Sequence, residues 1–268
     1  MRVAATIAKS DAGRIASGAE RVYTTAFAER RRIAVEFDQR TVVVTGAAGN
    51  LGSAVANAFA ERGARCVLVG HDRESLVRRF GEEDGRRLFV AADLARQADA
   101  DAVANAAMAK FGRIDVLCNI VGGFRMGEPV HRTSDATWQF LFDLNARSVL
   151  DMARAIVPKM LDAGRGAIVN VAAYAALKAS ANMGAYAASK SVVVRLTEAM
   201  AAELREHGIN VNCVLPTIID TPENRRAMPN ADPTRWVAPD DLARVIVFLA
   251  SPAARAIHGA ALPVSGLS

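Results

Sequence analysis

A tyrosine and a lysine four residues apart are the first candidates for chemistry. Tyr186 and Lys190 enclose Ala-Ala-Ser, and residues at positions i and i+4 share one face of a helix. A neighbouring ammonium stabilises a phenolate, so we expect Lys190 to lower the pKa of Tyr186 from its usual value of about 10. Reaching neutral pH would need about 4 kcal/mol, so a cationic cofactor or hydrogen-bond donors should share in the effect. The pair predicts a proton donor or acceptor, although the same spacing also occurs on solvated helices.

A glycine-rich loop near the start of the chain supports the chemical interpretation. It follows the apolar run Thr41–Thr45 and precedes a helical stretch, which is the setting of a dinucleotide site. The first glycine permits a tight turn, the second lets the backbone approach a pyrophosphate, and the third lets helix and strand pack closely. The N-terminus of the following helix attracts phosphate. The residues expected to bind the cofactor here are Gly46, Gly49, Asn50, Leu51 and Gly52.

Strand-like and helix-like stretches alternate along the chain and would position these groups. Apolar runs typical of buried strands cover Thr41–Thr45, Arg65–Val69, Leu88–Ala91, Asp115–Ile120, Ala167–Val171, Ile209–Leu215 and Ala261–Val264. Helical stretches cover Gly52–Arg62, Asp72–Phe80, Ala98–Phe111, Asp135–Asp162, Ala185–Glu206 and Asp240–Ala250. Strands without polar alternation indicate a parallel sheet that is covered on both faces. We therefore predict an α/β protein, a doubly wound Rossmann fold with about seven parallel strands.

The chain divides into an extension and one domain. Residues 1–38 precede the first convincing strand, and we expect an N-terminal extension there that is either helical or disordered. Residues 39–268 then form a single Rossmann-type domain without a second domain. The stretch from Pro216 to Pro239 is long, proline-rich and irregular. Loops of that length are usually lids or binding loops, so we predict a substrate lid at about 217–238.

Composition excludes several classes of function. The 268 residues are 51% apolar and 23% charged, with a net charge of +5. The arginines that carry this charge are scattered and form no basic stripe with interleaved aromatics, so we expect no nucleic-acid partner. No apolar run is long enough for a membrane span. Three cysteines without metal-ligand spacing predict reduced thiols, a cytoplasmic protein and no metal site. The positive charge suits an anionic ligand such as a phosphorylated cofactor.

The end of the second predicted strand bears on which nicotinamide cofactor is used. An acidic residue there would bind the ribose 2′-hydroxyl of NAD, whereas a basic one would suit the 2′-phosphate of NADP. Gly70 occupies the position where an acid would be expected. His71 and Arg73 could face a phosphate, while Asp72 would oppose it. We therefore expect NADP to be preferred, with NAD as the alternative. Asp93, which ends the third strand, could accept a hydrogen bond from the adenine amino group or cap the next helix.

With these pieces together, the chain resembles the short-chain dehydrogenase/reductase family from about Thr41 to the C-terminus. The matching residues are Thr45–Gly52, Asp93-Leu94, Asn145, Tyr186-x-x-x-Lys190 and Pro216–Thr221. The resemblance implies an NAD(P)-dependent oxidoreductase that acts on a small-molecule substrate. In that family's scheme Tyr186 is the general acid/base, Lys190 lowers its pKa and binds the nicotinamide ribose, and Asn145 holds a water in the proton relay.

The resemblance also assigns cofactor contacts and an assembly. It places the Ile218 backbone and Thr221 at the nicotinamide end, and Asn119 and Gly122 beside the adenosine ribose. It adds the motif residues Leu94 and Pro216 to the cofactor site. It further implies a homodimer or homotetramer that associates through the two long helices.

The chain departs from the family at the substrate position. The family has a serine thirteen residues before the tyrosine, and Ala173 stands there instead. Loss of one such donor costs on the order of 10²–10³ in rate. Tyr174, Ser180 or Asn182 could replace the hydroxyl, or could have no catalytic part. The dihydropteridine reductase branch, which the lid sequence also resembles, has alanine at this position and reduces a C=N system.

Two functions therefore stay open from the sequence. The first is hydride transfer to or from a carbonyl or C=N substrate, and the second is a catalytically impaired cofactor-binding sensor or scaffold. For the substrate site we expect Ala173, Tyr174, Met183 and Trp236 to form part of an apolar wall.

Overall fold

The computed structural model describes residues 36–268, which form one seven-stranded parallel sheet. The strands are β1 (Thr41–Thr45), β2 (Arg65–Gly70), β3 (Arg87–Ala91), β4 (Val116–Asn119), β5 (Gly166–Val171), β6 (Ile209–Pro216) and β7 (Ala261–Val264). They lie in the order β3-β2-β1-β4-β5-β6-β7. The order reverses between β1 and β4, and ligands of such sheets bind at the carboxyl ends of the strands beside this point. The predicted doubly wound Rossmann fold is confirmed.

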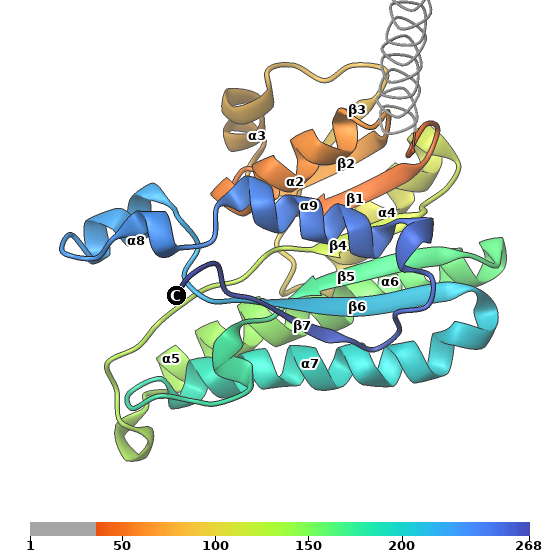
Figure 1. Cartoon of the computed structure of the whole chain (residues 1–268). Helices are drawn as coiled ribbons and strands as arrows, with labels where there is room; N and C mark the ends of the chain where they lie inside the picture. The colour runs from red at the N-terminus through yellow and green to blue at the C-terminus, as the bar shows by residue number, and fades with distance from the viewer. Residues whose placement is uncertain (1–35) are drawn as a thin grey trace, which may run out of the picture.

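Helices cover both faces of this sheet (Figure 1). They are α2 (Asn50–Ala60), α3 (Arg73–Phe80), α4 (Gln97–Phe111), α5 (Asp135–Phe142), α6 (Ser148–Ala163), α7 (Gly184–Leu204), α8 (Pro222–Ala227) and α9 (Pro239–Ala250). Buried side chains of α4, α6 and α7 pack on one face, and those of α2, α3 and α9 pack on the other. Within β1 the faces alternate, because Val43 belongs to the first core while Val42 and Val44 belong to the second. Within residues 36–268, no helix has the length and apolarity that crossing a bilayer requires.

The predicted helix over Asp135–Asp162 is interrupted by a π-helical turn. Residues Asp143–Arg147 form this turn between α5 and α6, and the Ser148 N–H donates to the Asp143 carbonyl five residues back. Such single-turn bulges are frequent at functional sites, and this one contains Asn145. Hydrophobic periodicity could not reveal it, because one extra residue in one turn hardly changes the apolar pattern of the flanking helices.

Phe37, which lies before the predicted boundary at residue 39, packs on the domain. Phe37 is fully buried, its ring packs edge-on against Phe59 at 4.9 Å, and its N–H donates to the Arg62 carbonyl. Residues 36–38 therefore belong to the folded domain, because a buried aromatic side chain closes the end of α2. The rest of the predicted extension lies outside the described residues. Within the irregular stretch 216–239, α8 forms one additional short helix, which stands out from the layered body in Figure 1.

Candidate active site

The glycine loop has the tight geometry that its sequence predicted. Gly46 has φ +63°, a conformation that favours glycine. A Cβ at Gly52 would lie 2.1 Å from the Gly46 carbonyl oxygen, so any larger residue would push helix and loop apart. Helix α2 begins directly after Gly49, and no side chain caps its N-terminus. Its first N–H groups therefore remain available to a phosphate.

Asn145 fixes the loop that follows β4. Its Oδ1 accepts from the Gly123 N–H at 2.8 Å, and its Nδ2 donates to the Gly123 carbonyl at 3.0 Å. The same Nδ2 donates to Ser189 Oγ at 3.0 Å, and that hydroxyl donates to the Tyr186 carbonyl. The π-helical turn thus ties the β4 loop to the helix that carries Tyr186. Ser189, which the sequence analysis missed, is the link, and only its place between Tyr186 and Lys190 hinted at it.

Lys190 reaches the same place from α7. The side chain is buried, and its Nζ donates to the Val171 carbonyl at the end of β5 at 3.0 Å. A Cβ at Gly122 would lie 2.8 Å from Lys190 Nζ and 3.0 Å from Asn145 Oδ1. Gly122 therefore lies between two of the predicted site residues, and its lack of a side chain lets them converge. Burial lowers the pKa of Lys190 to about 8, because the charged form loses its hydration.

Tyr186 lies partly buried on the same helix, beside an aromatic ring. The Phe124 ring meets the Tyr186 ring edge-on at a centroid distance of 4.8 Å. Burial raises the pKa of Tyr186 to about 12, because desolvation dominates while the Lys190 ammonium hydrogen-bonds to a backbone carbonyl. The expectation that Lys190, together with a cationic cofactor, lowers this pKa stays a prediction.

The predicted substrate residues have unequal exposure. Ala173 is buried at the end of β5, whereas Tyr174 is 46% exposed. Met183 is half-buried and immediately precedes α7. Trp236 is buried at the base of the lid, where its carbonyl lies close to Gly266 near the C-terminus. Trp236 therefore anchors the lid, and its burial gives no support to its assignment as a substrate wall.

The three candidates for the missing serine hydroxyl also lie on the segment between β5 and α7. Ser180 and Asn182 are exposed, and Asn182 has φ +60° while its carbonyl accepts from the Gly127 N–H. Among the described residues, neither these two nor Tyr174 has a side-chain hydrogen bond to Tyr186. None of the three is thus singled out by its contacts.

The end of β2 differs from the expectation for a phosphate site. Asp72 accepts from the Ser75 N–H at 2.7 Å and caps α3. Arg73 pairs with Glu83 at 2.7 Å and lies over the Phe89 ring. It is therefore held toward β3, and the suggestion that it faces a phosphate loses its support. His71 remains exposed. A Cβ at Gly70 would lie 3.0 Å from Leu76, so an acidic side chain would fit poorly there.

A different arginine lies against the glycine loop. Arg79, near the end of α3, donates from Nε to the Ala48 carbonyl and from Nη2 to Asn50 Oδ1, each at 3.3 Å. Asn50 in turn donates to Glu223 of α8 at 2.8 Å, so the lid contacts the loop directly. The sequence analysis missed Arg79, because nothing in its spacing predicts that the end of α3 folds back onto the loop.

Three predicted cofactor residues, Asp93, Leu94 and Asn119, lie near the ends of β3 and β4 and differ in exposure. Asp93 is exposed and its Oδ1 accepts from the Ala95 N–H, whereas α4 is preceded by Arg96. Asp93 therefore stabilises a turn and does not cap the helix. Leu94 is buried. Asn119 is buried, and its Nδ2 donates to Asn170 Oδ1 at 2.8 Å.

The lid begins where β6 ends. Pro216 is the last residue of β6. The Ile218 carbonyl accepts from the Val237 N–H at the other end of the lid. Thr221 caps α8 through Oγ1, which accepts from the Asn224 N–H. Arg225 and Asp220 form a two-point ion pair at 2.6 and 2.7 Å. These contacts hold Ile218 and Thr221 close together on one short stretch.

The three cysteines have no place in this site. All are buried and unpaired with one another. Burial raises the pKa of Cys66 to about 12 and that of Cys213 to about 11, and it also raises that of Cys118. Such thiols are poor nucleophiles at neutral pH.

Comparison with known proteins agrees with this geometry. The short chain dehydrogenase family profile matches residues 40–232. The chain belongs to this family. It is 37% identical to D-threitol dehydrogenase of Mycolicibacterium smegmatis, over 89% of this chain and 97% of that protein. It is 34% identical to cis-4-hydroxycyclohexanecarboxylate dehydrogenase of Sinomonas cyclohexanicum, over 86% and 96%.

A solved structure adds the cofactor class. The 3-ketoacyl-(acyl-carrier-protein) reductase of Brucella melitensis, complexed with NADH, superimposes with a TM-score of 0.77 at 33% identity. The match covers 85% of this chain and 98% of that one. The present chain is accordingly an NAD(P)-dependent oxidoreductase of the short-chain type.

Proposed function

We propose that the chain transfers hydride between a nicotinamide cofactor and a carbonyl or alcohol carbon, with Tyr186 as the proton donor or acceptor. The observation that carries this proposal is the convergence of Lys190 and Asn145 around Gly122 at the carboxyl edge of the sheet, with Asn145 linked through Ser189 to the Tyr186 carbonyl. Bound NAD(P) supplies the hydride for reduction or accepts it in oxidation. The protein's own side chains would bind the cofactor, transfer the proton and position the reacting groups.

The glycine loop and the lid would hold the cofactor. The free N–H groups at the start of α2 suit the pyrophosphate, and Lys190 suits the nicotinamide ribose. Ile218 and Thr221 would contact the nicotinamide end, and the exposed Asp93 would receive the adenine amino group. These residues fit a dinucleotide, because the loop excludes side chains where the backbone must approach it.

Tyr186 would handle the proton at its phenolic oxygen. With a pKa near 12 it is protonated at neutral pH and ready to donate during reduction. For oxidation its phenolate must be stabilised, and positive charge from Lys190 and from oxidised nicotinamide would lower its pKa. Asn145 acts as a positioning residue, because it fixes both the β4 loop and, through Ser189, the backbone of Tyr186.

We propose NADP as the preferred form. Gly70 stands where an acid would bind the 2′-hydroxyl of NAD, and Asp72 is engaged in capping α3. Arg79 brings a guanidinium to the glycine loop, where a 2′-phosphate would find a cation and a planar donor. The exposed His71 adds a second polar group at the end of β2.

The substrate proposal rests on the loop walls and the relatives. Phe124, Met126 and Leu177 are more than half exposed, as a wall for an apolar substrate would be. The matched M. smegmatis and S. cyclohexanicum proteins are named as dehydrogenases of a polyol and of a ring alcohol, which favours a carbonyl over a C=N substrate.

We further propose a homodimer or homotetramer through the exposed faces of α5 to α7, and a cytoplasmic location consistent with the free thiols.

The test is a cofactor-oxidation assay with NADPH and NADH against ketones, quinones and a quinonoid dihydropterin. Wild type and Ala173→Ser should be run in parallel. We expect turnover of a carbonyl with NADPH, and a gain of about tenfold or more in the variant, because the added hydroxyl supplies an oxyanion donor. Dihydropterin turnover that the added hydroxyl does not improve would instead favour C=N chemistry. Cofactor binding without turnover on the whole panel would contradict the proposal and favour a sensor.

A further inference from the structure

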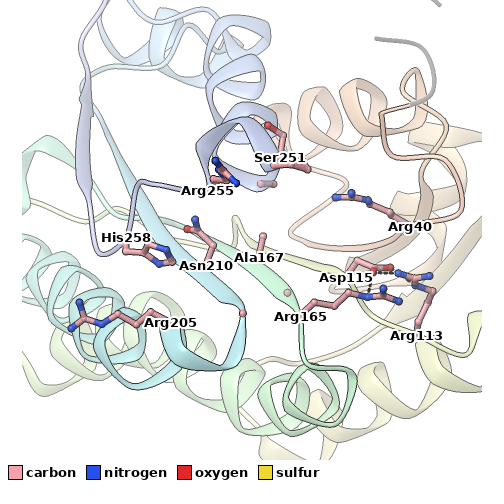
Figure 2. A pocket seen from close by; sticks show the side chains of 14 residues that line it. Arg40, Arg113, Asp115, Arg165, Ala167, Arg205, Asn210, Ser251, Arg255 and His258 are labelled. Atoms are coloured by element: carbon pink, nitrogen blue, oxygen red, sulfur yellow. Dashed lines mark hydrogen bonds and ion pairs between the residues drawn. The ribbon is translucent and has the colours of Figure 1, made fainter. Parts of the chain in front are cut away.

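The amino-terminal edge of the sheet, opposite the active site, carries an arginine-lined cavity. Its volume is about 380 Å³. Its walls come from the residues that start β1, β4, β5 and β6 and from the end of α9. The charged and titratable lining residues are Arg40, Arg113, Asp115, Arg165, Arg205, Arg255 and His258. Five arginines and one carboxylate thus line one small space (Figure 2).

The carboxylate orders one side of this cavity. Asp115 is buried and accepts from the Thr41 N–H at 2.9 Å. Arg113 binds it with two nitrogens, and Arg165 Nε lies 3.7 Å from it. Figure 2 shows these three side chains together on one side. A single carboxylate cannot neutralise two guanidinium groups, so this side keeps a net positive charge.

The other arginines have no partner among residues 36–268. Arg205 and Arg255 make no side-chain hydrogen bond or ion pair there, and Arg40 lies over the Phe37 ring at 5.5 Å without an acidic partner. The uncharged polar groups are already engaged: Asn210 donates to the Ala254 carbonyl and Ser251 to the Phe248 carbonyl. The groups left to receive a ligand are therefore the guanidinium groups and the His258 imidazole.

We propose that this cavity binds a compact small molecule that carries at least two phosphate groups. Guanidinium forks match phosphate oxygens in pairs, and cations on two sides of the cavity suit two separate anionic groups. The volume is at the lower end of small-ligand sites. Apart from His258 the lining has no aromatic ring, so it offers little surface on which a base could stack. The ligand is thus a short polyphosphate or a sugar bisphosphate and not a second dinucleotide.

The test is titration of the full-length protein with inorganic pyrophosphate by calorimetry at low ionic strength. Saturating NADPH should be present, so that the glycine loop is already occupied. We expect one binding event that weakens as salt rises and that survives NADPH. Each of Arg205→Gln and Arg255→Gln should weaken it about tenfold, because each removes a charged hydrogen-bond donor. Arg195→Gln, an exposed arginine of α7 outside the cavity, is the matched control.

Three outcomes would overturn the proposal. The first is binding that NADPH abolishes, because the anion would then occupy the glycine loop. The second is binding that Arg205→Gln and Arg255→Gln leave unchanged. The third is no binding of pyrophosphate at low ionic strength. Both arginines are exposed and far from the catalytic residues along the fold, so these variants should fold normally and keep their turnover.

Discussion

The two edges of one sheet use charge in opposite ways. At the carboxyl edge, one buried lysine lies beside Gly122, where an added Cβ would lie 2.8 Å from Lys190 Nζ. At the amino edge, several arginines stand partly or fully exposed around an open cavity. A buried charge changes its pKa and its cost depends on pH, whereas the attraction between exposed charges and ions weakens as salt rises. The comparison teaches that the first edge is built for proton chemistry and the second for attracting anions.

The largest expected effect comes from filling the space at the glycine loop. Gly52→Ala places a Cβ 2.1 Å from the Gly46 carbonyl oxygen, so the loop must move. The first N–H groups of α2 would then no longer point at the cofactor phosphates. We expect cofactor affinity to fall by about a thousandfold or more, together with lower thermal stability. Fluorescence titration with NADPH measures this. Gly85→Ala is the control, since its Cβ would meet nothing within 4 Å, and equal losses in both variants would contradict the account.

The buried charge of Lys190 should make stability depend on pH. Its folded pKa of about 8 lies below its unfolded value of 10.5, so the unfolded state binds more protons between these values and stability rises with pH there. The penalty, up to roughly 3 kcal/mol, is fully present below pH 8. The raised pKa of Tyr186 acts in the opposite direction only above pH 10.

Urea unfolding of the wild type and of Lys190→Met between pH 7 and 10 isolates this contribution. We expect the wild type to gain stability relative to the variant from about pH 8 upward. Lys159→Met, a half-buried lysine of α6, should show no such trend. A difference between wild type and Lys190→Met that stays constant over this range would mean that the lysine is not desolvated.

A smaller effect should separate the two cofactors. Arg79→Gln removes the guanidinium beside Ala48 and Asn50, so we expect KM for NADPH to rise about tenfold while that for NADH changes little. Arg78→Gln, its exposed neighbour paired with Glu74, controls for the loss of charge on α3. An equal rise for both cofactors would show that Arg79 supports the loop and does not read the 2′-phosphate.

The sequence predicted the architecture well, and its assignment of the carboxyl edge stays a prediction. Apolar runs and the glycine loop indicate the strands and the helix that follows β1, because these patterns act locally. It did not reveal Arg79 or the π-helical turn at Asn145, since both depend on how separate helices pack. The amino-edge cavity was also missed, because its arginines are scattered from residue 40 to residue 255 and come together only in the folded sheet.

The burial that raises the pKa of Tyr186 could not be predicted from the sequence for a related reason. Spacing placed Lys190 on the correct helix face, but burial and the hydrogen bond from Nζ to Val171 are tertiary facts. The same limit applied to Arg73, whose pairing with Glu83 depends on the turn after α3.

The most direct test of the central claim is hydride transfer in Tyr186→Phe, with cofactor affinity measured on the same preparation. The ring and its edge-on contact with Phe124 are kept, so only the phenolic oxygen is lost. We expect turnover to fall by about a thousandfold or more while the NADPH dissociation constant changes less than about threefold. Tyr174→Phe should retain turnover within about tenfold. Unchanged turnover in Tyr186→Phe would contradict the assignment of the carboxyl edge as the catalytic site.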